Sequence, residues 1–411
     1  MNTRKLFHIS SYLAALPVAT LIAAFDRYGD GVVIPQFAWP MVSALGASYL
    51  LPTLLLFSRK PRAQEDRIWR PLVTLMTSYL LAFSVLTGFR FYFSIGFTVT
   101  FIIITVLWTL WIDRYHVDEI SSNKFAIAKV GDWQLIHESS TDSTLLEDPS
   151  LLDMESFDGL VIDYHASLPD NWKSAIAQFA LSPRPVFHIS QFFEMAHERV
   201  AIGHLDDDHN ILGLSNSFYS LLKRGMDICL SATLSILLSL PLIIILFLVK
   251  ITSKGPSIYR QQRIGRNNKP FSLYKIRTMI NSAEHEGVKF TTFNDSRITK
   301  IGKYLRLLRI DEWPQFWNVL KGDMSIIGPR PERPEWVNQF NQKIPYYNLR
   351  HAVRPGITGW AQVKQGYATG LDESITKLEY DLYYIKHIGP YLDFRIAIHT
   401  LRVVFLQFGA K

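Results

Sequence analysis

Apolar residues in this chain of 411 are concentrated in a few long runs, and these runs constrain the fold more than any other feature. Four of the runs carry no charged residue: 9–25, 37–57, 71–88 and 94–112. A helix needs about 20 apolar residues to cross a bilayer. Because the runs are close to that length, closely spaced and bounded by charges, they predict four transmembrane helices within residues 1–120. A buried soluble bundle is the alternative.

The charges between these runs predict the orientation. "MNTRK" precedes the first run and "SRKPRAQEDRIWR" (58–70) joins the second to the third, whereas the other two links carry one Arg each. Since Lys and Arg accumulate on the cytoplasmic side, we expect a cytoplasmic N-terminus, and a return of the chain to the cytoplasm near Asp113. No small-residue cleavage site follows the first run, so a cleavable signal peptide is not expected.

Residues 121–205 are polar and predict a small cytoplasmic module. Short buried strands are expected at 124–130, 157–164 and 184–189, with a helix at 171–181. This order is typical of a degenerate, Rossmann-like α/β fold. No G-x-G-x-x-G follows any of these strands, so we expect a structural or interaction module without a dinucleotide site.

A fifth apolar run, residues 226–249, is long enough to span a bilayer, but its flanks argue against a simple crossing. Pro241 lies near its middle and favours a break, and the nearby Ser239 can re-satisfy backbone groups that the break leaves free. Positive charge lies on both sides of the run, at Lys223, Arg224, Lys250, Lys254, Arg260 and Arg263. We therefore prefer a re-entrant helix with both ends cytoplasmic over a straight span.

The net charge of +7 is unevenly spread. Residues 251–310 hold thirteen Lys or Arg against three acids, a composition typical of a surface for anionic lipid, phosphate or nucleotide. A merely solvated face is the alternative. The single cysteine, Cys229, excludes disulfides and a thiolate zinc cluster.

Two elements within this basic block place cations on defined faces. Residues 255–278 predict a β-hairpin in which Lys275 and Arg277 share one strand face and could clamp a diphosphate. The alternative without a binding function is a strand whose basic edge is exposed to solvent. Residues 298–309 predict an amphipathic helix at the membrane interface, although a soluble helix packed on a core has the same pattern.

An acid pair and a constrained arginine follow. The adjacent carboxylates Asp311 and Glu312 repel each other unless cations or a metal relieve the repulsion. One could then act as a nucleophile while the other helps to hold Mg²⁺. Pro329 and Pro331 restrict the backbone around Arg330, which suits bidentate binding of a phosphate. An acid pair alone is common on surfaces, but its combination with the preceding elements is specific.

From Lys223 to Phe405 the chain resembles the large bacterial phosphoglycosyl transferases, also called polyprenyl-phosphate sugar-1-phosphate transferases or initiating sugar transferases. The segments that carry the resemblance are "KRGMD", "KGPSIYRQQRIGRNNKPFSLYKIRTM", "DSRITKIGKYLR", "DEWPQFWNVLKGDMSIIGPRP", "RPGITGWAQV" and "YDLYYI". The N-terminal half is similar in plan to members with four spans and a cytoplasmic α/β module.

The resemblance implies the reaction. A UDP-sugar, with UDP-glucose or UDP-galactose as our guess, binds together with Mg²⁺. Asp311 attacks the sugar-linked phosphate and expels UMP, and polyprenyl (undecaprenyl) phosphate then takes the sugar phosphate from the enzyme. Glu312, alongside Asp311, holds the metal. In the family this is the first membrane step of exopolysaccharide, capsule or O-antigen synthesis.

The match also implies substrate-binding residues: Lys275, Arg277, Arg330, Asp295, Arg297 and Arg354. Lys275, Arg277 and Arg330 correspond to phosphate-binding cations. Asp295 and Arg297 correspond to a recurring polar pair, and Arg354 either contacts the nucleotide or supports the fold. Trp313 departs from the family, which often has leucine there, and changes local packing without removing a reactive group.

These inferences predict an α+β membrane protein of the bacterial cytoplasmic membrane with its active site on the cytoplasmic face. The expected domains are 1–120, 121–205 and a catalytic domain at 206–411. Expected partners are the UDP-sugar, polyprenyl phosphate, membrane lipids and a second copy in a homodimer, with no nucleic acid. Two alternatives stay open: a glycosyl transferase that moves the sugar without its phosphate, and a non-catalytic scaffold for polysaccharide assembly.

Overall fold

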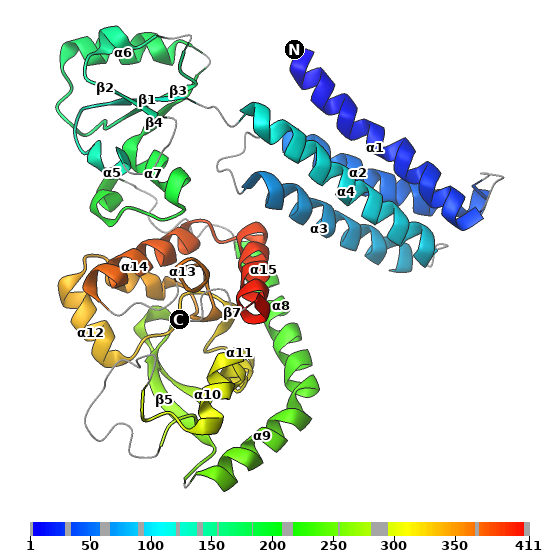
Figure 1. The fold of residues 1–411 in the computed structure, drawn as a ribbon, viewed down its shortest axis with the longest axis vertical. Helices are drawn as coiled ribbons and strands as arrows, with labels where there is room; N and C mark the ends of the chain where they lie inside the picture. Colours follow the sequence, from blue (N-terminus) through cyan, green and yellow to red (C-terminus); the bar gives the residue numbers. More distant parts are fainter. Residues whose placement is uncertain are drawn as a thin grey trace. The chain divides into compact units, whose positions relative to one another are not determined.

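The structure is a computed structural model in which mixed α/β architecture and a parallel sheet are evident (Figure 1). It describes residues 3–28, 34–57, 66–88, 94–120, 124–137, 143–153, 156–182, 184–207, 217–253, 255–280, 295–365 and 370–406. The chain divides into two compact units, Met1–Ala196 and His197–Lys411, which we describe separately. The three domain ranges expected from the sequence stay predictions.

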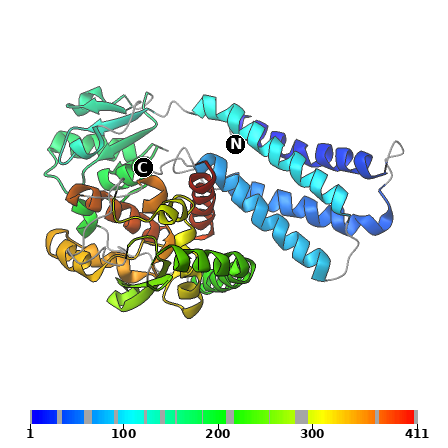
Figure 2. The same cartoon turned by 60° about the horizontal axis from the view of Figure 1, so that its bottom comes forward.

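Four long helices begin the first unit: α1 (Thr3–Tyr28), α2 (Trp39–Phe57), α3 (Asp66–Gly88) and α4 (Ile95–Ile120). They lie side by side in Figures 1 and 2. Small residues of α1 such as Ala19 and Ala23 pack in one cluster with Phe97 and Phe101 of α4. Taken one at a time, the helices of the described chain lack the combined length and hydrophobicity of a membrane span, so the four crossings are not confirmed.

A parallel four-stranded sheet follows, in the order β2-β1-β3-β4. Its strands are β1 (Phe125–Ala128), β2 (Ser143–Leu146), β3 (Gly159–Ile162) and β4 (Val186–His188). α6 (Asp170–Ala180) packs Trp172 and Phe179 with Ala126 and Ala128, whereas α7 (Ile189–His197) contributes Phe192 to the cluster of Ile127 and Val161. The three expected strands and the helix are confirmed. The short strand β2 was not predicted.

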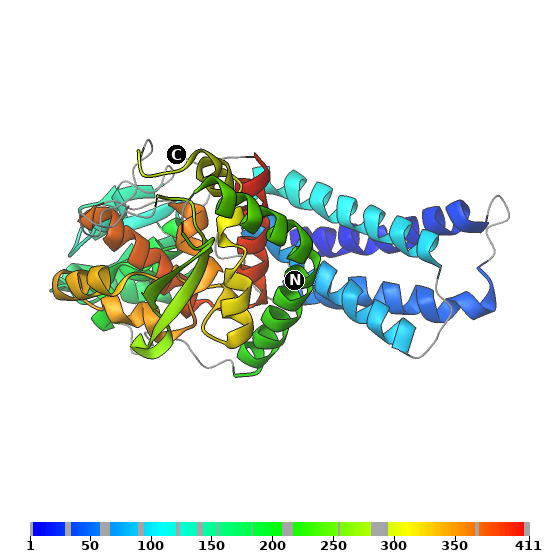
Figure 3. The same cartoon turned by 90° about the horizontal axis from the view of Figure 1, so that it is seen from below.

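The second unit starts at His197, and a 3-10 turn (Ile202–Asp207) precedes its bent helix pair, α8 (Ser217–Leu237) and α9 (Ser239–Thr252) (Figure 3). The two helices meet at 61°, and only together do they reach the length and hydrophobicity of a broken span or re-entrant loop. Pro241 lies in the first turn of α9, where a missing N–H removes no helix bond. The Ser239 hydroxyl donates to the Ile236 carbonyl at 2.7 Å. The expected break near Pro241, and the role of Ser239 at it, are confirmed.

A two-stranded hairpin comes next and is also confirmed: β5 (Ile258–Ile264) pairs antiparallel with β6 (Pro270–Ile276). Then α10 (Lys300–Leu307), a 3-10 turn (Ile310–Glu312) and α11 (Gln315–Lys321) follow. Ile301 and Leu305 of α10 pack near Ile276, while Tyr304 and Leu308 are exposed. Only Gly fits at position 302, because a Cβ there would lie 2.1 Å from the Thr278 carbonyl oxygen.

The last part of the chain builds the core that carries the P-R-P segment. Strands β7 (Ser325–Ile327) and β8 (Gly356–Thr358) pair in parallel and are surrounded by α12 (Pro334–Lys343), α13 (Trp360–Lys364), α14 (Leu371–Lys386) and α15 (Pro390–Leu406). Gly328 and Gly356 approach so closely that a Cβ on Gly356 would lie 2.1 Å from the Gly328 nitrogen. This backbone contact places Arg330, two residues after Gly328, beside β8.

Candidate active site

The acid pair lies on a tight turn between α10 and α11. Arg309 adopts a left-handed conformation with φ 55°, which ends the helical run and starts the 3-10 turn that carries Asp311 and Glu312. The Glu312 N–H donates to the Arg309 carbonyl at 3.2 Å and closes the turn. Both carboxylates are buried, with 8% of Asp311 and 7% of Glu312 exposed. The 3-10 turn thus directs both carboxylates into the interior of the protein.

Three cations surround Glu312. Arg330 Nη2 donates to its Oε1 at 2.8 Å, Lys275 Nζ lies at 3.6 Å and Arg309 Nη1 at 3.7 Å from the same oxygen. Burial by itself would raise the pKa of Glu312, but Arg330, Lys275 and Arg309 together lower it to about 2. Glu312 is therefore an anion at neutral pH.

Asp311 has a different environment. Burial, followed by the charge of Glu312, raises its pKa above the usual value for an aspartate. From the residues that the structure describes, Asp311 receives no hydrogen bond and no ion pair. A carboxylate with raised basicity and unused oxygens is suited to act as a nucleophile. The two acids of the pair thus have distinct chemistry.

The P-R-P segment is held from both sides. Arg350 Nη2 donates to the Arg330 carbonyl at 3.0 Å, and Arg263 Nη1 donates to the Pro331 carbonyl at 2.8 Å. The guanidinium of Arg330 bridges Glu312 and the side-chain oxygen of Gln362, the latter at 3.0 Å. These contacts fix the guanidinium in one orientation, in agreement with the restricted backbone that the sequence predicts.

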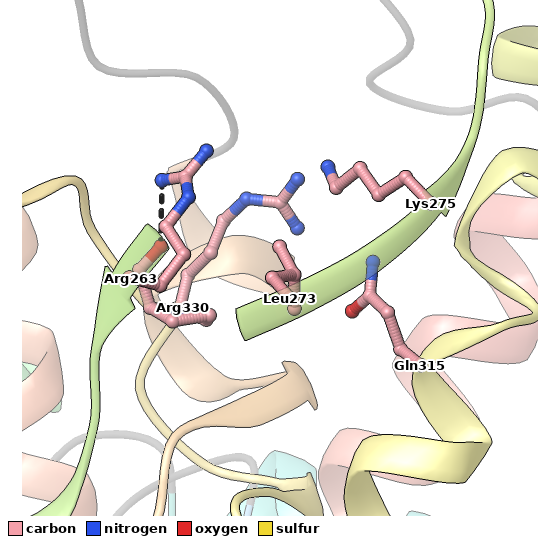
Figure 4. A pocket seen from close by; sticks show the side chains of 6 residues that line it. Arg263, Leu273, Lys275, Gln315 and Arg330 are labelled. Atoms are coloured by element: carbon pink, nitrogen blue, oxygen red, sulfur yellow. Dashed lines mark hydrogen bonds between the residues drawn. The ribbon is translucent and has the colours of Figure 1, made fainter. Parts of the chain in front are cut away.

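A small pocket opens beside the acid pair (Figure 4). The pocket is lined by Arg263, Leu273, Lys275, Gln315, Arg330 and Pro331. Burial lowers the pKa of Lys275 to about 8, although Glu312 opposes this shift. Figure 4 shows the side chains of Lys275 and Arg330 extending toward one another above Leu273. Cations that converge in this way suit the oxygens of a phosphate group.

Arg277 lies apart from this pocket. The strand β6 ends at Ile276, and Arg277 Nη2 donates to the carbonyl and hydroxyl oxygens of Ser253 at 2.7 and 2.6 Å. It also contacts the Val249 carbonyl at 3.4 Å. Arg277 therefore binds the carbonyl groups at the end of α9, which have no partner inside the helix. The structure does not bring it together with Lys275 as the predicted clamp.

Arg354 and the Asp295–Arg297 pair also lie outside the pocket. Arg354 Nε donates to the Gly322 carbonyl at 3.0 Å, at the end of α11, so its contact supports the fold. Arg297 donates to the two Asp295 oxygens at 2.8 and 2.6 Å, and this pairing lowers the pKa of Asp295 to about 2. The pair shapes the turn that leads into α10.

The acid pair is compatible with Mg²⁺ only when a substrate contributes ligands. Among the residues that the structure describes, no three His, Cys, Asp or Glu side chains gather around one point. Mg²⁺ is commonly bound through one or two carboxylates, with phosphate oxygens and water completing its octahedron. The unused oxygens of Asp311, next to Glu312, fit that kind of site.

Sequence reasoning missed four residues of the site: Arg263, Gln315, Arg350 and Gln362. For Arg263 a signal existed. In the antiparallel register Arg263 lies opposite Phe271, and Tyr259 lies opposite Lys275, so Arg263 and Lys275 share a face. Gln315 lies three residues after Glu312, in a motif whose acids alone drew attention. Arg350 and Gln362 come from distant segments, and their contacts with Arg330 have no periodic signature.

Comparisons with known proteins show the family of the chain. Residues 218–407 match the family model described as bacterial sugar transferase. An N-acetylgalactosaminephosphotransferase of Aeromonas hydrophila, named for UDP-N-acetylgalactosamine and undecaprenyl phosphate, is 37% identical over 97% of this chain and 95% of its own length. UDP-glucose:undecaprenyl-phosphate glucose-1-phosphate transferases of Klebsiella pneumoniae and Escherichia coli are 42% and 43% identical, over 47% and 44% of this chain and 42% and 39% of their own lengths.

Proposed function

The chain belongs to the bacterial polyprenyl-phosphate sugar-1-phosphate transferases, and we propose that it transfers a sugar 1-phosphate from a UDP-sugar to undecaprenyl phosphate. The observation that carries the proposal is a buried carboxylate, Asp311, that has no hydrogen bond or ion pair among the described residues and lies near a pocket of cations. A transferred phosphoryl group needs both a nucleophile and positive charge at its oxygens.

In the first half-reaction an Asp311 oxygen forms a bond to the sugar-linked phosphorus. The bond from that phosphorus to the bridging oxygen breaks, and UMP leaves with the bond's electron pair. In the second half-reaction a phosphate oxygen of undecaprenyl phosphate attacks the same phosphorus. Asp311 leaves as a carboxylate, and the product is a lipid diphosphate sugar.

The cations serve both half-reactions because both attack the same phosphorus. Lys275 and Arg330 lie where they can hold the non-bridging phosphate oxygens, and Glu312 keeps Arg330 oriented at 2.8 Å. These preorganised charges stabilise the charge that builds up in each transition state. Bound Mg²⁺, held by Asp311 and Glu312, would supply further neutralisation of the phosphate charge.

A lipid acceptor requires the site to lie at a membrane surface, and we propose that α8 and α9 form a re-entrant anchor. The apolar side chains Ile243, Phe247 and Ile251 of α9 are exposed, and basic residues lie on both sides of the apolar run 226–249. Re-entry keeps the active site on the cytoplasmic face, where nucleotide sugars are available. The exposed Leu80 and Leu81 of α3 support the further proposal that α1–α4 span the membrane.

Three UDP-sugars are candidates for the donor. A relative that matches nearly the whole chain is named for N-acetylgalactosamine, and two that match 47% and 44% of it are named for glucose. Galactose comes from the sequence expectation. We place the reaction at the start of the synthesis of an exopolysaccharide, capsule or O-antigen.

A nucleotide product assay tests the proposal. Purified protein is incubated with undecaprenyl phosphate and each of UDP-N-acetylgalactosamine, UDP-glucose and UDP-galactose. We expect one donor to yield UMP in a 1:1 ratio to lipid-linked sugar, and the Asp311→Asn variant to yield neither. Release of UDP would instead establish a transferase that moves the sugar without its phosphate. Full turnover by Asp311→Asn would remove Asp311 from the chemistry.

A further inference from the structure

Gln315 is buried without a hydrogen bond for its side-chain amide nitrogen. It is the first residue of α11, and only 2% of it is exposed. No acceptor for its Nε2 is found in the part of the chain that the structure describes. A buried polar group that lacks a partner lowers the stability of the fold, so such a group calls for an explanation.

The surroundings of this amide explain why it has no partner. Gln315 lines the same pocket as Arg263, Lys275 and Arg330. Figure 4 shows its amide nitrogen on the side of the pocket toward which Lys275 and Arg330 extend. Ammonium and guanidinium groups only donate hydrogen bonds, so none of the three can accept one from Gln315. Arg330 and Arg263 already donate to acceptors of the protein. The Gln315 amide has none among the described residues, and a ligand oxygen in the pocket would supply one.

We propose that Gln315 is a substrate-binding residue, whose Nε2–H donates a hydrogen bond to a non-bridging oxygen of the phosphoryl group held between Lys275 and Arg330. This inference rests on the proposed function and adds a residue to it. A phosphoryl group offers several anionic acceptor oxygens, which matches the converging donors of the pocket. The neutral amide adds a directed contact without adding charge beside Glu312.

The decisive variant is Gln315→Leu, which removes the donor and keeps a side chain of similar length. Because no internal hydrogen bond is lost, we expect its thermal unfolding temperature to equal or exceed that of the wild type. We expect kcat/KM to fall about 10- to 100-fold, the effect of one hydrogen bond to a charged group. Gln315→Glu replaces the donor by an anion and is expected to lose more.

Two kinetic arms distinguish the sources of the phosphoryl group. One measures kcat/KM for the UDP-sugar and the other kcat/KM for undecaprenyl phosphate. A fall in both assigns Gln315 to the transferred phosphoryl group, and a fall in only one assigns it to the phosphate of that substrate. The matched control is Gln262→Leu, on the exposed face of β5, whose amide donates to the Ser272 hydroxyl at 3.3 Å. We expect this variant to keep wild-type kinetics.

The inference is overturned if Gln315→Leu keeps wild-type kcat/KM in both arms. It is equally overturned if the loss of activity is matched by a lower unfolding temperature, since Gln315 would then support the fold. Neither result touches the proposed function, which fails only if the wild-type protein makes no lipid-linked sugar phosphate.

Discussion

At the scale of single residues, the different neighbours of two adjacent acids shift the pKa values of their carboxyl groups in opposite directions. Glu312 has Arg330 at 2.8 Å and two further cations within 4 Å, so it stays charged and orients the arginine. Asp311 lacks such partners among the described residues and is more basic. Our account therefore assigns the nucleophile to Asp311 and the electrostatic anchor to Glu312.

These protonation states predict a bell-shaped dependence of kcat/KM for the UDP-sugar on pH. Activity rises with pH as Asp311 loses its proton, and this limb lies above the range of an ordinary aspartate because its pKa is raised. Activity falls above a pH of about 8, because Lys275 then loses its charge. In Lys275→Arg the alkaline limb should move out of the measurable range. A wild-type profile that stays flat from pH 7 to pH 9.5 would contradict the role of Lys275.

The sequence predicted that Lys275 and Arg330 lie near the acid pair, as they do in the structure. This prediction came from the family resemblance, whose motifs imply which residues meet in the folded protein. The structure places Arg277 away from the clamp that the sequence predicts. Strand alternation places Arg277 on the face of Lys275, but the strand ends one residue earlier and the side chain turns to the end of α9. That contact joins residues 24 positions apart in the sequence, and the alternation of residues along a strand does not predict it.

At the scale of elements, α10 sets the position of the acid pair through a close backbone approach. Gly302→Ala would place a methyl group 2.1 Å from the Thr278 carbonyl oxygen, a clash with backbone that cannot swing away. We expect a loss of about 1–3 kcal/mol of stability and lower activity, since Asp311 follows this helix. The thermal unfolding temperature and kcat/KM report the two effects.

The control for this prediction is Gly225→Ala in α8. No described atom outside its own helix lies within 4 Å of the added methyl group. Alanine favours helix over glycine by about 1 kcal/mol, so this variant should be as stable as the wild type or more so. Equal unfolding temperatures for Gly302→Ala and the wild type would refute the close approach.

A second element-scale prediction concerns Glu332, which lies behind the P-R-P segment. Its carboxylate pairs with Lys377 and lies 3.6 Å from Arg263 and 3.9 Å from Arg350, the two arginines that hold this segment. Burial alone would raise the pKa of Glu332, but these cations lower it to about 2. Glu332→Gln leaves three largely buried cations with too little negative charge, at a cost of about 3 kcal/mol.

We expect Glu332→Gln to lower both the unfolding temperature and kcat/KM, because Arg330 loses its support. Glu335→Gln, on the exposed side of α12, is the matched control and should change stability by less than about 0.5 kcal/mol. If the two variants behave alike, the ion network does not support the site.

At the scale of the whole molecule, a short segment before the bent helix pair belongs with the catalytic unit. Glu198 accepts two hydrogen bonds from Arg395, at 2.6 and 3.0 Å, and pairs with Lys364 at 2.9 Å. Trp360 Nε1 donates to the Glu198 carbonyl at 3.0 Å. The turn formed by Ile202–Asp207 adds Leu205 to the same core.

Two fragments test this assignment. Residues 197–411 keep Glu198, whereas residues 208–411 leave Arg395 and Lys364 without their carboxylate. We expect the longer fragment to have the higher unfolding temperature in detergent and the shorter one to aggregate or to unfold at markedly lower temperature. Indistinguishable stability of the two fragments would show that the segment is only a linker.

The sequence predicted the large-scale plan where a period or a composition encodes it, as in the α/β module, the hairpin and the break near Pro241. The sequence suggests a catalytic domain that starts at residue 206, whereas the second compact unit starts at His197. Glu198 is recognised only through partners 166 and 197 residues further along the chain, and no local pattern connects them. The short strand β2 was missed for a related reason, since four residues with a half-exposed pattern resemble a loop.

The central claim is that Asp311 carries the sugar phosphate between the two half-reactions. The most direct measurement is intact-protein mass spectrometry of the purified enzyme incubated with its UDP-sugar and no lipid acceptor, followed by peptide mapping. We expect a mass increase of one sugar phosphate, located on Asp311, that disappears when undecaprenyl phosphate is added. An enzyme that turns over yet never acquires this adduct, or acquires it on another residue, would contradict the account.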